Sequence, residues 1–369
     1  MIFSNGHFLI ALIAAITLST LLLLKLPRFA IHIDLVDHPD ERKQHNGKVP
    51  LIGGIAMFSA FSFSALFLDV PLGQLRGLFA GAMLLVIVGV LDDLHELTSV
   101  ARFIAQILAA ILMAEWGEVR LVDLGWISPS GELVQLNWWS SLLTIFAAVG
   151  IINAVNMMDG IDGLAGSISL VAVLSMAILA WHQGGAGSMQ LLLLLSAVIM
   201  VFLFFNRHPA SNTNNAEKNT GRQRVFMGDA GSMFLGFILV WFFIQLSQDS
   251  PSDSSRVMAP VTALWIFLVP LFDTVAQMFR RILQGKSPFS ADRKHIHHIL
   301  LDRGHSKRDT LRILLSIAIA AAVIGITADI SGFSQAFMFY LFLFLFVIYF
   351  TTVCYGTQVY RWMTETFRG

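Results

Sequence analysis

Asn153-Ala-Val-Asn-Met-Met-Asp-Gly-Ile-Asp-Gly-Leu-Ala-Gly166 joins the end of one long apolar run to the start of the next. This stretch carries Asn156 and two carboxylates, Asp159 and Asp162, among closely spaced glycines. Ionised side chains at the edge of a membrane span are costly to remove from water, which favours a functional role. A helix-capping turn is the simpler alternative, because Asn and Asp are good N-terminal caps. Further polar clusters elsewhere in the chain favour the functional interpretation.

The composition is that of an integral membrane protein. Of the 369 residues, 56% are hydrophobic and only 13% are charged, whereas soluble domains carry about 25% charged residues. The formal net charge is zero, so no overall field favours a nucleic-acid partner. Cys354 is the single cysteine, which excludes an internal disulfide framework and thiolate metal clusters.

Hydropathy predicts an all-α polytopic membrane protein with about eleven transmembrane helices. The predicted spans are 8–27, 51–69, 76–91, 100–116, 138–155, 166–182, 189–206, 229–246, 257–284, 310–328 and 335–356. A periplasmic N-terminus and a cytoplasmic C-terminus put all but three of the 24 Lys and Arg residues on the cytoplasmic side. Such an asymmetry sets the orientation of membrane helices. On the other side, the turn Pro129-Ser-Gly131 predicts a small external hairpin.

The polar clusters all fall in loops assigned to the cytoplasm. These loops cover residues 28–50, 91–99, 153–166, 207–232 and 285–309. Ordinary capping turns would be scattered over both sides of the membrane, so this segregation predicts one common site. We therefore expect a single integral membrane domain, residues 1–369, whose site faces the cytoplasm.

Carboxylates at two of these loops suit metal and phosphate chemistry. Asp92 and Asp93 could bind a divalent cation, accept a proton, or both. A solvated helix end is the alternative, but acidic residues are unfavourable at the C-terminal end of a helix. Asp229 lies between glycines in Phe226-Met-Gly-Asp-Ala-Gly-Ser232, where exposed backbone amides suit a magnesium–phosphate complex. A tight turn entering a helix is the alternative there.

The last long loop gathers histidines and cations. They are Arg293, Lys294, His295, His297, His298 and Arg303. A zinc site is disfavoured because no cysteine or positioned Glu accompanies the histidines. Positive charge on the cytoplasmic side explains Lys and Arg without any function. We favour a phosphate clamp, since Arg and Lys bind phosphate oxygens well.

Together these clusters predict phosphoryl transfer, in which metal and cations neutralise the transferring group while a nucleophile is aligned. A site at the membrane rim predicts a lipid-borne acceptor and a soluble cytosolic donor. A transporter or lipid flippase is the competing class, with ionisable residues near the midplane of several spans. Only Asp273 comes close to the midplane, which favours an enzyme. The nearby Pro270 predicts a bend in this span.

These motifs resemble the polyprenyl-phosphate N-acetylhexosamine-1-phosphate transferase superfamily over most of the chain. The most specific segments are 153–163, 226–232, 260–265, 287–290 and the His-Ile-His-His of 295–298. The details of segments 287–290 and 295–298 point to the bacterial N-acetylglucosamine branch. The resemblance implies a bacterial inner-membrane enzyme with eleven transmembrane helices, which takes UDP-N-acetylglucosamine as donor and undecaprenyl phosphate as acceptor. Mg²⁺ is the implied cofactor, with Mn²⁺ as an alternative.

The implied products are UMP and undecaprenyl-diphosphate-N-acetylglucosamine, the first membrane intermediate of O-antigen or enterobacterial common antigen synthesis. Another UDP-N-acetylhexosamine as donor stays open, and so does the oligomeric state, with a homodimer as one option.

The resemblance also implies roles for individual residues. Asn156 and Asp229 would hold the metal, and Asp162 would contact the uracil. Asp92 and Asp93 would serve the acceptor phosphate, one of them as a base, and Asp159 would lie in the site. The remaining substrate-binding residues would be Lys43, His45 and Lys48 of the first loop, which match loosely, and Arg293, His295, His297, His298 and Arg303, which would handle the diphosphate.

Overall fold

The computed structural model describes residues 6–38, 48–207, 223–248, 256–287 and 295–366. The helices are α1 (Gly6–His32), α2 (Gly53–Ala65), α3 (Arg76–His95), α4 (Ser99–Ile111), α5 (Ser140–Met158), α6 (Leu164–His182), α7 (Ala186–Asn206), α9 (Gly228–Ser247), α10 (Pro260–Ile266), α11 (Leu268–Leu283), α12 (Ile296–Asp302), α13 (Lys307–Ile330) and α14 (Gln335–Thr366). The strands β1 (Val36–Asp37) and β2 (Val49–Pro50) pair in antiparallel fashion. Short helical turns cover Leu72–Leu75, Leu112–Trp116 and Asn137–Trp139.

The chain is a helical polytopic membrane protein. Within the described residues, nine helices are long and apolar enough to cross a membrane. Two of the predicted spans differ from these nine. Span 51–69 contains the shorter helix α2, and span 257–284 is divided into α10 and α11, which meet at 86°. Every predicted span therefore has a helical counterpart, while the number of membrane crossings stays a prediction.

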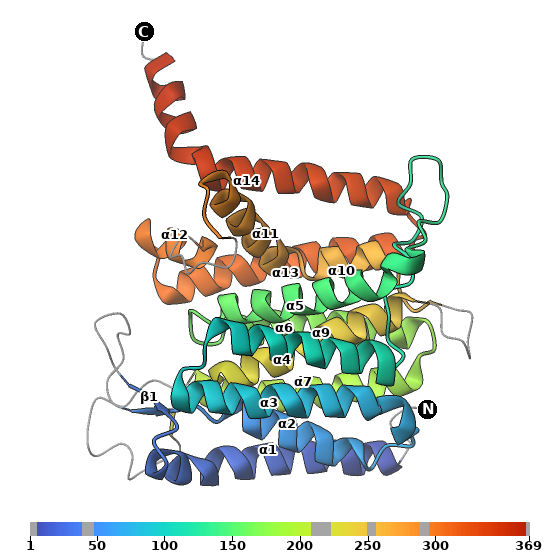
Figure 1. Cartoon of the computed structure of the whole chain (residues 1–369), viewed down its shortest axis with the longest axis vertical. Coiled ribbons are helices and arrows are strands. Elements are labelled where there is room, and N and C mark those ends of the chain that lie inside the picture. Colours follow the sequence, from blue (N-terminus) through green and yellow to red (C-terminus); the bar gives the residue numbers. More distant parts are fainter. Residues whose placement is uncertain (1–5, 39–47, 208–222, 249–255, 288–294, 367–369) are drawn as a thin grey trace.

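The break between α10 and α11 follows from a proline. It lies at Phe267, and Pro270 stands in the first turn of α11. Proline has no backbone N–H, so the carbonyl of Ile266, four residues earlier, cannot receive its usual helical bond. The bend predicted from Pro270 is thus confirmed, just N-terminal to the proline. Figure 1 shows α11 leaving the direction that α10 and the neighbouring helices share.

Helix α9 lies at the centre of the bundle (Figure 1). Its side chains are buried along its length, among them Phe234 and Trp241. Two glycines bring neighbouring helices against its N-terminal end, because glycine permits close backbone approach. A side chain at Gly54 of α2 or at Gly89 of α3 would overlap the α9 backbone around Ala230. The ends of α2, α3 and α9 therefore meet, and the polar loops lie there.

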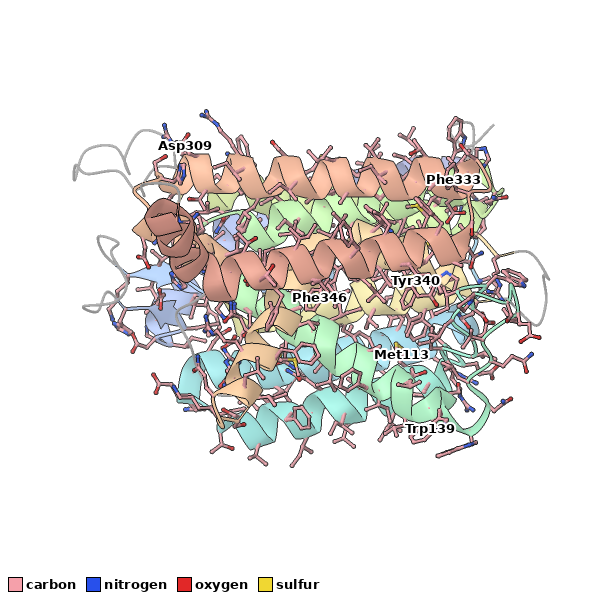
Figure 2. All side chains as sticks on the ribbon, turned by 90° about the horizontal axis from the view of Figure 1, so that it is seen from above. Met113, Trp139, Asp309, Phe333, Tyr340 and Phe346 are labelled. Atoms are coloured by element: carbon pink, nitrogen blue, oxygen red, sulfur yellow. The ribbon has the colours of Figure 1, made fainter. Side chains whose placement is uncertain are left out.

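The outer helices show what the lipid would contact. Helices α13 and α14 run in opposite directions along one face (Figure 2). Large apolar side chains of α14 are exposed on it, including Phe337, Tyr340 and Phe344. At the end of the bundle near the N-terminus, Leu124 donates a backbone hydrogen bond to Val134 (2.9 Å), which confirms the predicted hairpin.

Candidate active site

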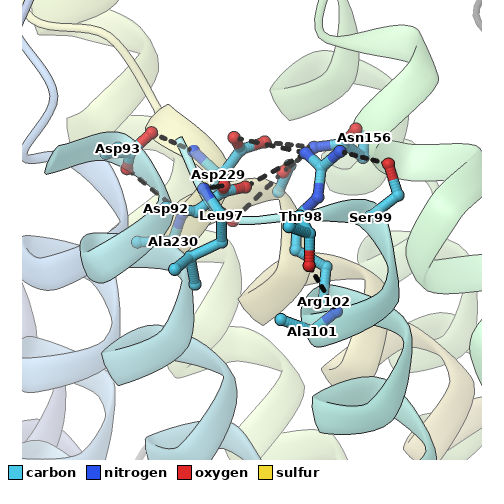
Figure 3. Close-up of polar contacts among 11 residues, drawn as sticks. Asp92, Asp93, Leu97, Thr98, Ser99, Ala101, Arg102, Asn156, Asp229 and Ala230 are labelled. Atoms are coloured by element: carbon cyan, nitrogen blue, oxygen red, sulfur yellow. Dashed lines mark hydrogen bonds and ion pairs between the residues drawn. The ribbon is translucent and has the colours of Figure 1, made fainter. Parts of the chain in front are cut away.

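Two helix ends meet at the centre of the candidate site. Asp93 lies in the last turn of α3, and its carboxylate accepts the backbone N–H groups of Asp229 (2.9 Å) and Ala230 (3.4 Å) (Figure 3). A carboxylate is unfavourable at the C-terminal end of its own helix but favourable at the N-terminal end of another. Packing of α3 on α9 therefore explains a position that the sequence alone marks as unfavourable.

Asp92 turns to different partners. Its buried carboxylate accepts the backbone N–H of Leu97 (2.7 Å) and Nη1 of Arg102 (3.0 Å). The same arginine nitrogen lies 3.9 Å from Oδ2 of Asp229, so Arg102 joins α3, α4 and α9. The sequence motifs did not assign Arg102 to the site. Its position could have indicated a role, because it lies in the first turn of α4, and only a short turn separates α4 from the aspartate pair.

Asn156 connects α5 to α9. Its amide nitrogen donates to Oδ1 of Asp229 (2.5 Å) and to the hydroxyl of Ser232 (2.9 Å). Both bonds use the nitrogen, which leaves the amide oxygen available to another group. The structure thus brings together the two residues that the resemblance assigns to the metal.

The loop between α5 and α6 supplies two more carboxylates. Asp162 forms an ion pair with Arg224, whose guanidinium lies 4.9 Å from the centre of the Phe226 ring. Asp159 follows the last residue of α5 and is exposed. Gly163 begins α6 with a φ of +76°, a conformation that side chains rarely adopt. This glycine allows the loop to turn back so that both carboxylates face the site.

An open cavity of about 890 Å³ contains these groups. Its charged and titratable lining residues are Asp34, Asp37, His38, Asp92, Asp93, Glu96, Arg102, Asp159, Asp162, Arg224, Asp229 and Lys307. Carboxylates outnumber cations, so a diphosphate would be repelled there unless further positive charge accompanied it. Within the described residues, no three His, Cys, Asp or Glu side chains could hold a metal by themselves. Asn156 and Asp229 still fit Mg²⁺, which usually takes one or two protein groups together with water and phosphate oxygens.

The histidines of α12 lie beside the loop between α5 and α6. His297 is buried, and a side chain at position 160 would overlap its Nε2. Neither of its ring nitrogens has a hydrogen-bond partner within the described residues. Burial, assisted by the neighbouring His298, lowers the pKa of His297 to about 4. His295 instead bonds Asp273 of α11, with 2.8 Å between Nδ1 and Oδ2. Arg303 is exposed at the far end of α12.

The first basic loop is described only in part. Lys43 and His45, and likewise Arg293 of the histidine loop, lie outside the described residues. Lys48 pairs with Asp34 (2.9 Å), which lines the cavity. Hydrogen bonds from Lys48 and His38 lower the pKa of Asp34. Lys48 is therefore next to the cavity, because its partner Asp34 lines it.

A second cavity, apolar and of about 470 Å³, lies beside the first. Residues of α4, α5, α9, α10 and α11 line it, including Phe267 at the helix break. Consecutive residues line the two cavities: Arg102 and Phe103 on α4, then Asn156 and Met157 on α5. An amphiphile could thus place a charged head in one cavity and an apolar tail in the other.

Known proteins match the chain over this region. The model of the family described as Glycosyl transferase family 4 matches residues 75–247, which hold Asp92, Asp93, Asp159, Asp162 and Asp229. An undecaprenyl-phosphate alpha-N-acetylglucosaminyl 1-phosphate transferase of Salmonella typhi is 35% identical over 339 residues, 92% of this chain and 89% of the relative. The protein of the same name from Escherichia coli (strain K12) is 34% identical, over 92% of this chain and 89% of the relative. The one from Haemophilus influenzae is 33% identical, over 90% of each chain.

Proposed function

The chain belongs to glycosyl transferase family 4, together with the undecaprenyl-phosphate alpha-N-acetylglucosaminyl 1-phosphate transferases, and we propose that it catalyses that transfer. A phosphate oxygen of undecaprenyl phosphate attacks the phosphorus of UDP-N-acetylglucosamine that bears the sugar. The bond from this phosphorus to the bridging oxygen breaks, and UMP leaves with that oxygen. The lipid product is undecaprenyl-diphosphate-N-acetylglucosamine.

The adjacency of the two cavities carries this proposal. A polyprenyl phosphate needs an apolar channel that ends at cations and metal-suited carboxylates, and the helices α4 and α5 supply both surfaces with consecutive residues. Arg102 is the cation at this boundary, so we assign it to the acceptor phosphate. Asp92 and Asp93 hold Arg102 and the start of α9 in place, and one of them is the candidate base.

We assign the donor to the part of the polar cavity that Asp162 and Arg224 line. Asp162 and Arg224 offer a hydrogen-bond acceptor and a cation beside an aromatic ring, groups that suit a uracil nucleotide. His297 and His298 lie in the first turn of α12 and His295 directly precedes this helix, and we place the diphosphate there. Asp159 lines the same cavity as Asp162 and Asp229.

Mg²⁺, with Mn²⁺ as the alternative, is the proposed cofactor, held by Asp229 and the amide oxygen of Asn156. When bound, a divalent ion neutralises charge on the phosphates during transfer. The excess of carboxylates in the cavity supports this proposal. The protein's own part is to hold the two side chains together, which the bond from the amide nitrogen of Asn156 to Asp229 does.

We further propose that the protein crosses the bacterial inner membrane with eleven helices, a periplasmic N-terminus and a cytoplasmic site. The charge asymmetry supports this orientation, because Lys and Arg stay preferentially in the cytoplasm. The product would enter O-antigen or enterobacterial common antigen synthesis.

Purified protein in detergent tests the reaction directly. With undecaprenyl phosphate, Mg²⁺ and UDP-N-acetylglucosamine, we expect UMP release that depends on the lipid, together with a lipid product heavier by one N-acetylglucosamine phosphate. UDP-N-acetylgalactosamine in a parallel reaction tests the sugar. UMP release without lipid, or faster transfer of another sugar, would contradict the proposed acceptor or donor.

A further inference from the structure

Asp273 is a completely buried carboxylate within α11. Its Oδ2 lies 2.8 Å from Nδ1 of His295. Its Oδ1 accepts the backbone N–H of Ile296 (2.8 Å) and the hydroxyl of Tyr349 (3.2 Å). An ionisable residue inside a membrane protein is costly and usually functional. All of these partners are internal, so the carboxylate holds other parts of the protein and does not itself face a transport path.

The bond to Nδ1 decides how the His295 ring can act. An ionised carboxylate only accepts hydrogen bonds, so Nδ1 must carry the hydrogen. Nε2 is then the nitrogen left to meet a ligand. It donates to a phosphate oxygen only when the ring is protonated at both nitrogens, a form that a neighbouring carboxylate favours. Carboxylates behind metal-binding histidines fix ring orientation and tautomer in the same manner. Asp273 therefore sets the direction of the ring and which of its nitrogens is available.

The bond to Ile296 fixes the start of α12 as well. Further along this helix, His297 packs against Gly160 of the loop between α5 and α6. Neighbouring residues on α11, Leu271 and Thr274, line the apolar cavity. Asp273 thus connects α11, which lines the apolar cavity, to the histidines beside the polar cavity.

We propose that Asp273 is a positioning residue that acts through His295 and holds its Nε2 toward the diphosphate of the donor. This inference rests on the proposed transferase function. Asp273 itself touches no substrate, so its removal should slow transfer only while His295 is present.

A double-mutant cycle tests this dependence. Asp273→Asn keeps the shape and retains one oxygen for the N–H of Ile296, but its amide N–H then faces Nδ1. The His295 ring can then no longer be protonated at both nitrogens and loses its positive charge toward the diphosphate. We expect kcat/KM for UDP-N-acetylglucosamine to fall by about 10- to 100-fold, the usual loss when the carboxylate behind a functional histidine is changed. The KM for undecaprenyl phosphate should stay unchanged. The double variant with His295→Ala should be no slower than His295→Ala alone.

Asp329→Asn is the matched control. Asp329 lies in the last turn of α13 and accepts a backbone N–H, from Ala259 (2.9 Å), and the hydroxyl of Thr262. The Asp329→Asn variant should catalyse transfer at the wild-type rate. Additive losses in the Asp273 and His295 cycle, or a wild-type rate for Asp273→Asn, would overturn the inference. A wild-type protein that makes no lipid product would instead refute the proposed function.

A second variant covers the case in which Asp273→Asn does not fold. In His295→Asn, the side-chain amide nitrogen takes the place of Nδ1 and preserves the bond to Asp273, but no group replaces Nε2. We expect this variant to fold, by its thermal midpoint in detergent, and to be as slow as His295→Ala. A folded His295→Asn that transfers at the wild-type rate would overturn the inference, because the bond to Asp273 would then be sufficient.

Discussion

The bundle carries a polar cluster at each end, and the two are built differently. At the end near the N-terminus, Asp123 receives two hydrogen bonds from Arg256 (2.8 and 2.7 Å), and Gln248 accepts the backbone N–H groups of Val122 and Asp123. At the other end, near β1 and α12 in Figure 1, Arg102 is shared between Asp92 and Asp229. Among the described residues, no ion pair there reaches Asp93 or Asp159.

This difference distinguishes a polar cluster that stabilises the fold from one that is suited to bind ligands. The buried carboxylate of Asp123 has both oxygens bonded to one arginine, so its charge is neutralised and it stabilises a loop without offering an oxygen to a ligand. An excess of carboxylates around a cavity keeps like charges together at an energetic cost. Such an arrangement indicates that a cation and a charged substrate complete the cluster. The predictions that follow compare the two ends, from the largest expected effect to the smallest.

Asp229→Asn should cause the largest loss. It keeps the shape but removes charge from the unbalanced cluster, so we expect turnover to fall at least about a hundredfold, as when a preorganised electrostatic group is removed. The thermal midpoint in detergent should change little, because the cavity is open. Turnover is measured across a magnesium series. Near-normal turnover with an unchanged magnesium requirement would place the ion elsewhere, with Asp92 and Asp93 as the first alternative.

Asp123→Asn should show the opposite pattern. The charge of Arg256 would stay largely buried without its carboxylate, and we expect a loss of about 2 kcal/mol in the free energy of unfolding. Transfer per folded molecule should be unchanged. Thermal unfolding in detergent and activity of the monodisperse fraction measure the two quantities. A stable variant that has lost activity would erase the distinction between the two ends.

Asp162→Ala separates a ligand contact from an ion pair within the functional cluster. If Asp162 bonds the uracil, the KM for UDP-N-acetylglucosamine should rise about tenfold, the effect of one lost hydrogen bond. Steady-state kinetics at saturating lipid measure this change. Arg224→Ala removes the same ion pair and leaves the carboxylate in place. Equal donor KM values for wild type and Asp162→Ala would show that Asp162 serves only to hold Arg224.

His297 gives the smallest effect, which depends on pH. Its pKa is about 4 when folded, against 6.5 in an unfolded chain. Between these values the unfolded state binds more protons, so stability falls as the pH drops through this window. From pH 7.5 to pH 5.5, wild type should lose about 1 kcal/mol more than His297→Gln. Thermal midpoints at both pH values measure this difference, and parallel losses would show that His297 has the same pKa in the folded and the unfolded protein.

The sequence predicted the helices well, and several of its polar motifs come together at one cavity in the structure. Long apolar runs form helices because lipid leaves no other partner for the backbone, and each predicted span contains one. The grouping of Asp92, Asp93, Asn156, Asp159, Asp162 and Asp229 around one cavity also agrees with the predicted common site. Local patterns suffice here, because hydropathy and loop charge act on each segment separately.

Only the tertiary structure decided which groups are partners. Asp93 caps α9, Arg102 bridges two aspartates, and Asp273 holds His295 across contacts between distant parts of the chain. None of these pairs follows from spacing, because each depends on how helix ends meet. Gly54 and Gly89 allow α2 and α3 to touch α9, and Pro270 turns α11 away from α10. The residue types of the site are thus inherent in the sequence, whereas their pairing arises from helix packing.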